Sequence, residues 1–241
     1  MSPRFYFSGT LPRAGEIAFP PAAAHHALKV LRLAPGDAVT LFDGSGGELR
    51  ARLDIRGRSA HAVDGQWLET DERESPLALV LVQALVSADK MDWAIQKAVE
   101  LGASGFIPLL TARSLPHPGE ARAARKIEHW QQTIIAACEQ CGRNRLPFIA
   151  PVQNLASYLG RHKDAMRLIF IPGGTPLSAI RPVPSVPVHL LVGPEGGWRE
   201  EEQMLCQRAG CQSIGMGPRI LRTETAGLAA IAALQVLAGD F

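Results

Sequence analysis

The sequence predicts an α/β protein in which a parallel sheet with helices on its faces follows a small β-rich domain. Strand-like apolar runs alternate with helical patterns after residue 76, as expected of repeated β-α units. The first run, Leu77–Val86, is almost wholly apolar, which is typical of a strand covered on both faces. Before residue 70 the apolar pattern has a period of two, and a charged stretch at 71–76 separates the regions. We therefore expect domains at residues 1–72 and 73–241.

The first region reads as short strands around one helix. Arg4–Phe7 and Ala38–Phe42 suit strands, and Asp43–Gly47 is a glycine-rich hairpin loop. Pro20-Pro21 begins a helix that reaches Leu31, because proline is accepted in a first helical turn. Ala34–Asp37 has the composition of a turn.

The strand after the hairpin is rich in arginine. Its apolar residues share one face, and the opposite face carries Asp54 with four arginines: Arg50, Arg52, Arg56 and Arg58. Such a row can lie along a phosphate backbone, and an ordinary solvated strand face is an equally good interpretation. Residues of the early helix that extend the basic patch are His25, His26, Lys29 and Arg32.

The second region alternates strands with helices. Asp89–Leu101 has helical spacing before Gly102, and Glu120–Gln140 predicts a long helix. A further helix is expected at Glu200–Ala209. The remaining strand candidates are Ser104–Leu110, Pro147–Pro151, Arg167–Pro172, Val186–Val192 and Cys211–Met216.

Three glycine-containing loops follow predicted strands: Pro172–Thr175, Gly193–Gly197 and Gly215–Arg222. Ligands of parallel sheets bind beyond the carboxyl ends of the strands, so we expect these loops to form one site. The alternative is that they are only tight turns. The tail that follows, Leu228–Ala238, is almost wholly apolar. A helix that is apolar all round must be buried in its own domain, in a partner subunit, or in both.

The loops do not match the common phosphate-binding motifs. No Gly-Lys-Ser/Thr ends a P-loop, and the Gly215–Ile220 stretch lacks the third glycine of a Rossmann fingerprint. Glu195 and the acids Glu200–Glu202 would repel a polyphosphate. The loops therefore favour an uncharged or cationic ligand, and S-adenosylmethionine, which has a sulfonium and no phosphate, meets that description.

Composition and cysteine content narrow the remaining classes. The net charge of +2 gives no global basic field, and the four cysteines are too few for a disulfide framework. No signal peptide and no apolar run of the ~18 residues of a membrane span is evident, so we expect a cytoplasmic protein. Cys138 and Cys141 form a C-x-x-C inside a helical pattern, where buried cysteines are a better interpretation than zinc. We expect no metal site and no serine or cysteine nucleophile.

Six longer motifs indicate a more specific family of proteins than the glycine loops do. They are His26–Arg32, Leu41–Gly44, Lys90–Gly102, Ala136–Arg145 (which includes Cys-Glu-Gln-Cys-Gly-Arg-Asn), Val192–Gly197 and Gly217–Ala226. In these motifs the chain resembles, nearly end to end, the bacterial 16S rRNA (uridine-N3) methyltransferases of the RsmE type, in the SPOUT superfamily. The glycine loops alone would indicate only SPOUT methyltransferases in general.

The resemblance implies a PUA-like RNA-binding β-barrel at residues 1–72 and a knotted SPOUT methyltransferase domain at 73–241. It implies a deep trefoil knot, S-adenosylmethionine as cofactor, a homodimer, and methylation of uridine N3 in 16S rRNA or the 30S subunit, with no DNA or membrane partner. The expected cofactor-binding residues are Pro172, Val192, Gly193, Pro194, Glu195, Gly196, Met216, Gly217, Ile220, Leu221 and Arg222. The expected RNA-binding residues are Arg32, Arg50, Arg52, Arg56, Arg58, Arg143 and Arg145.

Arg222 is the candidate catalytic residue, because a guanidinium can donate to the oxygens of a uracil anion or to phosphates. An equal alternative is that Arg222 pairs with Glu224 or Glu195 and only braces the fold. Two other functions stay open: a SPOUT enzyme that methylates a ribose 2′-hydroxyl or a tRNA base, and a non-catalytic RNA-binding protein of ribosome assembly.

Overall fold

The structure, a computed structural model, describes residues 2–69, 73–183 and 185–241. The chain divides into two compact units. Unit 1 contains Met1–Glu74 and Cys138–Leu146, and unit 2 contains Ser75–Ala137 and Pro147–Phe241. The predicted boundary at 72 and 73 lies partly outside the described residues. The assignment of Cys138–Leu146 to unit 1 differs from the sequence prediction, which places this segment in the second domain.

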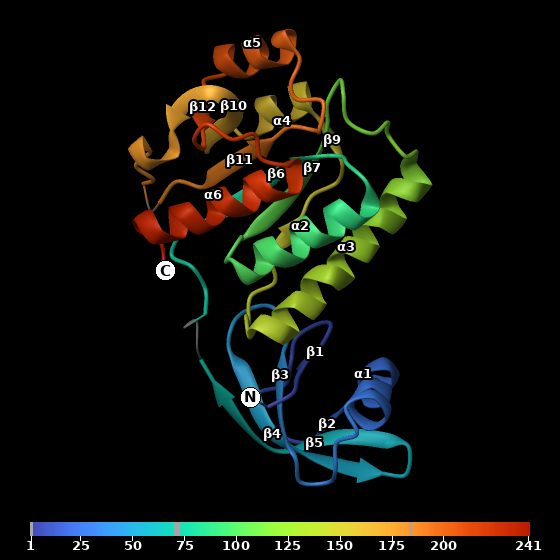
Figure 1. The fold of residues 1–241 in the computed structure, drawn as a ribbon. Helices are drawn as coiled ribbons and strands as arrows, with labels where there is room; N and C mark the ends of the chain where they lie inside the picture. The colour runs from blue at the N-terminus through green and yellow to red at the C-terminus, as the bar shows by residue number, and fades with distance from the viewer. Residues whose placement is uncertain (1, 70–72, 184) are drawn as a thin grey trace. The chain divides into compact units, whose positions relative to one another are not determined.

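Unit 1 is built on a curled five-stranded sheet with the spatial order β1-β3-β4-β5-β2 (Figure 1). Its core consists of apolar residues such as Phe5, Leu41, Leu49 and Leu53, each almost fully buried. Its elements are β1 (Arg4–Tyr6), β2 (Ile17–Ala18), α1 (Pro21–His25), the π-helical turn η1 (His26–Val30), β3 (Ala38–Phe42), β4 (Glu48–Arg56) and β5 (Ser59–Leu68). The strands, helix and hairpin predicted from the sequence are therefore confirmed.

Two strands of unit 1 are missing from the sequence prediction. The longer one, β5, pairs antiparallel with β4, but the register shifts between Arg50 and Arg52. Opposite this shift, Asp64 has a positive φ of 53° and Gly65 follows it. The irregularity interrupts the period of two that identifies a strand. The arginine row also ends earlier than predicted, because β4 stops at Arg56 and Arg58 lies in the following turn.

Unit 2 is a parallel sheet with helices on both faces, which confirms the α/β fold class. Within the described residues every strand pair of this sheet is parallel, and the spatial order is β12-β10-β11-β6-β7-β8, with β9 beside β7. The strands are β6 (Leu79–Ala84), β7 (Gly105–Leu110), β8 (Phe148–Ile149), β9 (Gln153–Asn154), β10 (Met166–Pro176), β11 (Val188–Val192) and β12 (Gln212–Gly215). The helices are α2 (Ala88–Glu100), α3 (Glu120–Cys141), α4 (Leu155–Arg161), the 3-10 turn η2 (Leu177–Ala179), α5 (Glu200–Arg208) and α6 (Thr223–Ala238). The knot implied by the family resemblance stays a prediction.

The two helical layers of unit 2 use different faces of the sheet. On one face, α4 and α5 pack against side chains such as Val80, Ile107 and Leu191. On the other, α6 packs against α2, β6 and β11 (Figure 1). The approach of α6 to the sheet depends on Gly227, since a Cβ there would lie 2.7 Å from Cδ1 of Leu81. The last helix thus lies over β6 and over β11, whose end carries the loop Gly193–Gly197.

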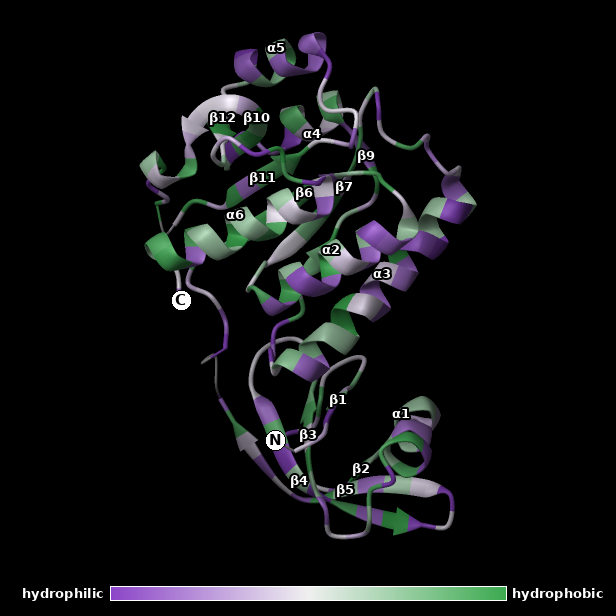
Figure 2. Cartoon of the chain, viewed as in Figure 1, coloured by the Kyte–Doolittle hydropathy of each residue, from purple (hydrophilic) through white to green (hydrophobic). Residues whose placement is uncertain are grey.

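The apolar tail is only partly buried within this chain. Figure 2 shows α6 as hydrophobic along most of its length. One side is buried through Leu228, Ile231 and Leu234, whereas Val236 is 67% and Leu237 46% exposed. The prediction that the helix is buried all round is therefore not met by the chain alone. A partner subunit, the second possibility left open by the sequence, would cover the exposed side.

Candidate functional site

The three predicted glycine-containing segments meet at the carboxyl edge of the parallel sheet and line a partly open cavity of about 760 Å³. This volume is within the range of ordinary small-molecule sites. The first of these segments, Pro172–Thr175, was predicted as a loop after a strand but lies within β10, where the register against β12 shifts. A Cβ on Gly174 would lie only 2.7 Å from main-chain atoms of Ile214, so the two strands approach closely there. Residues of all three segments line this one cavity, as the prediction of a single site requires.

The cavity contains nearly all the residues expected to hold the cofactor. Those that line it are Pro172, Val192, Gly193, Pro194, Glu195, Met216, Gly217, Ile220, Leu221 and Arg222. Gly196 is the exception among the predicted residues. Its carbonyl accepts a 2.6 Å hydrogen bond from Arg113, and a Cβ on Gly196 would meet the Arg113 side chain. Gly196 therefore faces the loop after β7, away from the cavity lining.

Several residues at or beside the cavity were not identified from the sequence, among them the following four. Lys90, Trp198 and Thr223 line it, and Arg113 fixes the loop behind it. Lys90 and Arg113 come from parts of the chain more than 80 residues away from the loops they contact. Trp198 directly follows the second glycine loop, and Thr223 directly follows Arg222. Their position beside predicted ligand loops could have identified both as candidate site residues.

A chain of hydrogen bonds joins β6, α6 and the second loop beneath the cavity. The Gln83 side-chain amide donates to the Thr223 hydroxyl at 2.8 Å. That hydroxyl donates to the Gly193 carbonyl at 2.6 Å. Gln83 and Thr223 are both buried, so these groups depend on each other for hydrogen bonding. The contact sets the position of the second loop relative to the start of α6.

Replacing Thr223 with valine is expected to destabilise the protein by about 1–3 kcal/mol, because the shape is kept while the Gly193 carbonyl loses its donor. Binding of S-adenosylmethionine should weaken as the loop loosens. Urea unfolding and calorimetry measure the two effects. Thr223→Ser retains the hydroxyl and serves as the matched control. A valine variant indistinguishable from wild type in both measurements would contradict this role.

The acidic residues near the cavity are not free negative charges. Lys90 donates a short hydrogen bond to Glu195 and lies 3.8 Å from the Glu224 carboxylate. The bond with Glu195 raises the pKa of Lys90, and the nearby charge of Arg222 partly opposes this. Glu202 accepts from the main-chain N–H groups of Arg199 and Ala112, so it belongs to a helix cap. The expectation that these acids would repel a polyphosphate is therefore weakened, because Glu195 is paired with Lys90 and the other charged side chains that line the cavity are Arg219 and Arg222.

Arg222 is at the rim of this cavity, as the N-cap residue of α6. Its side chain is exposed, and within the described part of the chain no ion pair joins it to Glu195 or Glu224. Both glutamates contact Lys90 instead. The bracing alternative is therefore not seen in this structure, and the guanidinium is available to a substrate.

The predicted RNA-binding arginines of the first region are exposed but differ in their contacts. Arg50, Arg52 and Arg56 lie on β4, with Arg58 in the turn and Arg32 after η1, and all five are exposed. Arg56 is held by Glu16 and Asp54, and Arg50 by Glu48. Arg52 donates only to the Gly36 carbonyl, among the contacts of the described residues.

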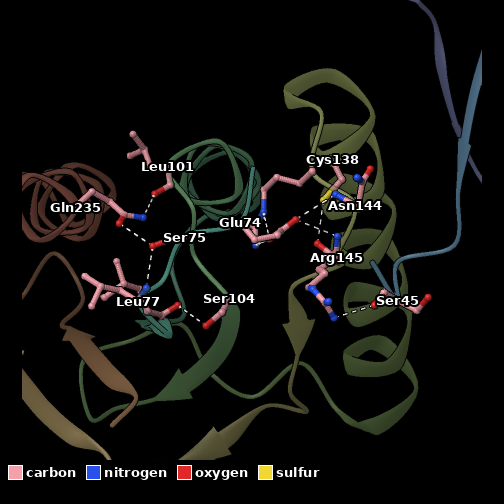
Figure 3. Close-up of polar contacts among 12 residues, drawn as sticks. Ser45, Glu74, Ser75, Leu77, Leu101, Ser104, Cys138, Asn144, Arg145 and Gln235 are labelled. Carbon is pink, nitrogen blue, oxygen red and sulfur yellow. Dashed lines mark hydrogen bonds and ion pairs between the residues drawn. The ribbon is translucent and has the colours of Figure 1, made fainter. Parts of the chain in front are cut away.

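The Cys-Glu-Gln-Cys-Gly-Arg-Asn motif is a structural part of unit 1. Arg143 is 5% exposed and pairs with Glu74 at 2.8 Å, so the prediction that it contacts RNA is corrected. Figure 3 shows Glu74 accepting from the main chain of Asn144 and Arg145, and Arg145 donating to the Ser45 carbonyl. Arg145 remains exposed and stays a candidate.

Of the two cysteines of this motif, Cys138 is buried and Cys141 is partly buried. Burial raises the pKa of the Cys138 thiol to about 12, which keeps it protonated at neutral pH. All four cysteines of the chain are free thiols. Within the ranges that the structure describes, no three histidine, cysteine or acidic side chains come together as metal ligands.

The chain matches known families over most of its length. An RNA methyltransferase domain family matches residues 73–235, and an RNA methyltransferase PUA domain family matches residues 19–63. The ribosomal RNA small subunit methyltransferase E of Bacillus subtilis is 33% identical, with 90% of each chain covered. That of Synechocystis is 34% identical over 90% of this chain and 71% of its own.

A solved structure agrees with this chain across its full length. The ribosomal RNA small subunit methyltransferase E from Neisseria gonorrhoeae bound to S-adenosyl methionine is 40% identical. The alignment covers 100% of both chains with a TM-score of 0.91. The likeness therefore includes the sheet, the loops at its edge and the curled sheet of unit 1.

Proposed function

Since the chain belongs to the RNA methyltransferase family that includes the ribosomal RNA small subunit methyltransferases E, we propose that it methylates N3 of one uridine in 16S rRNA. Its methyl donor is S-adenosylmethionine. The observation that carries this proposal is the cavity formed by three glycine-containing loops at the carboxyl edge of the sheet. The cavity lies in the unit that matches the methyltransferase family.

The residues around the cavity fit S-adenosylmethionine. Apolar side chains of Ile171, Ile214 and Leu221 can cover an adenine, and the loop main chain supplies donors and acceptors. The buried indole N–H of Trp198 has no partner within the described residues, so a ligand acceptor can use it. The loops lack the Gly-Lys-Ser/Thr motif of a P-loop. The domains proposed for this function are an RNA-binding domain at 1–72 and a methyltransferase domain at 73–241.

The bound donor supplies an electrophilic methyl group, so the protein's task is chiefly to align the attacking nitrogen and to manage its charge. The uracil N3 must lose its proton, which leaves negative charge on the neighbouring oxygens O2 and O4. Arg222, exposed at the rim of the cavity, can donate to those oxygens through its planar guanidinium. A target base has to be unpaired or flipped to reach such a cavity.

Unit 1 is proposed to position the RNA through its exposed arginines. Arg52→Glu is expected to weaken binding of 16S rRNA about tenfold and to lower the salt dependence of binding, because it removes a phosphate contact. Affinity for S-adenosylmethionine should not change, since the residue lies in the other unit. Filter binding at several salt concentrations measures the RNA affinity. Lys163→Glu, an equal charge reversal at an exposed site of unit 2, is the control, and equal loss in both variants would overturn the assignment.

The proposed partners are 16S rRNA or the 30S subunit and a second copy of the chain, in the cytoplasm. The dimer is supported by exposed apolar side chains on two adjacent helices: Trp93 of α2 is 44% exposed and Val236 of α6 67%. Burying such side chains against a second copy would remove an apolar patch from water. Sedimentation equilibrium measures the mass, and a monomer at micromolar concentration would contradict this part. Within the described ranges, none of the helices has both the length and the apolar character to span a membrane.

One assay tests the proposed reaction. The protein is incubated with methyl-labelled S-adenosylmethionine and unmodified 30S subunits or 16S rRNA, and the RNA is digested to nucleosides. The expected label is in N3-methyluridine. Label in a 2′-O-methylated nucleoside would favour a ribose methyltransferase. In a parallel reaction with unmodified tRNA, label in the tRNA alone would favour a tRNA enzyme, and no label in either reaction would favour a non-catalytic RNA-binding protein.

A further inference from the structure

Three segments of unit 2 bring their charges together at the rim of the cavity. Lys90 stands in the first turn of α2, Glu195 in the loop after β11, and Glu224 in the first turn of α6. Lys90 contacts both acids. The side chains of Lys90 and Glu224 are 21% and 15% exposed, whereas Glu195 is 63% exposed and lines the cavity with Lys90. A change in any one of these groups changes the net charge that a ligand meets.

The donor and its product differ in charge at one atom. During transfer, the nitrogen lone pair forms the bond to the methyl carbon, the carbon–sulfur bond breaks, and its electron pair stays on sulfur. The uracil proton leaves to solvent. The sulfonium thereby becomes the neutral thioether of S-adenosylhomocysteine. The electrostatic potential at the cavity therefore acts on the donor and much less on the product.

We propose that Lys90 is a specificity-determining residue that sets how strongly the cavity prefers the cationic donor over the neutral product. This inference rests on the proposed function. By pairing Glu195 and Glu224, Lys90 offsets their negative charge and, with Arg219 and Arg222 of the cavity lining, makes the potential at the cavity more positive. A stronger negative potential would stabilise the bound sulfonium more than the transition state, in which the positive charge is leaving sulfur, and would slow the transfer.

Calorimetry with S-adenosylmethionine and S-adenosylhomocysteine separately tests this balance. Lys90→Met is expected to raise the ratio of the product Kd to the donor Kd about three- to fivefold, as for one charge in a largely aqueous dielectric. Glu195→Gln should lower the ratio. The double variant Lys90→Met/Glu195→Gln, which restores the net charge, should return the ratio to near the wild-type value.

The same helix offers a matched control. Lys97 of α2 pairs with Glu100 at 2.7 Å and does not line the cavity, so Lys97→Met makes the same change in net charge elsewhere. Its ratio should be unchanged. If Lys90→Met weakens both ligands equally, or Lys97→Met shifts the ratio as much, Lys90 only braces the loop and the inference is overturned. Should Lys90→Met not fold, Glu195→Gln alone decides, because an unchanged ratio contradicts the inference. Wild-type protein that binds no S-adenosylmethionine would instead contradict the proposed function.

Discussion

Replacing Arg222 with alanine is expected to lower the rate of methyl transfer about 10²- to 10³-fold, the usual effect of removing one donor that stabilises charge in a transition state. The side chain is exposed at the cavity rim and the neighbouring acids are held by Lys90, so its loss should leave the fold intact. Single-turnover assays with bound RNA measure the rate. Calorimetry should still detect S-adenosylmethionine.

Two further variants test whether the reaction needs the planar guanidinium of Arg222 or only a positive charge. Arg222→Lys keeps the charge but not the planar fork, so it should recover only part of the rate. Arg208→Ala, in the last turn of α5, removes an exposed arginine away from the cavity and should behave as wild type. Full methylation by Arg222→Ala with unchanged RNA affinity would rule out a role for this residue in the reaction.

Replacing Arg4 with methionine is expected to lower the free energy of unfolding by about 3 kcal/mol, because it leaves a buried carboxylate without its main partner. Arg4 and Glu48 form a 2.7 Å ion pair, and their side chains are 4% and 2% exposed. Arg4 also donates to the Asn144 side chain, so the loss extends to the segment that returns from α3. Arg50 and Arg73 still contact Glu48. We therefore expect the loss in free energy of unfolding to lie at the lower end of the range for breaking a buried ion pair.

The pH dependence of stability provides an independent measurement. Burial alone would raise the pKa of Glu48, but hydrogen bonds and charges from Arg4 and Arg50 outweigh burial and lower it. The resulting stability is present above the unfolded-state pKa of about 4.3 and is lost as pH falls through the folded-state value. Urea unfolding between neutral and acidic pH should therefore show a flatter dependence for Arg4→Met. A loss under 1 kcal/mol with an unchanged pH dependence would contradict this role.

Whether a strand or loop could be predicted depends on whether its pattern is contained in a few neighbouring residues. Ala38–Phe42 matches a strand of the structure residue for residue, because its apolar pattern and flanking turns are contained in a few positions. The strand Ser59–Leu68 was not predicted from the sequence. Asp64, which has a positive φ, and the register shift against β4 interrupt the alternation of apolar and polar residues by which a strand is recognised. The loops around the cavity were predictable since each follows an apolar strand and contains glycine.

Contacts between residues far apart in the chain could not be predicted from the sequence. The sequence by itself determined the α/β class and the glycine-containing segments of the site, because periodicity and glycine spacing are local properties. The ligand followed from the resemblance to a known family. Only the tertiary structure decided that Arg143 is buried against Glu74, that Cys138–Leu146 belongs to unit 1, and that Lys90 neutralises Glu195. The partners in those ion pairs are separated by 69 and 105 residues, and no local pattern encodes which charges the fold brings into contact.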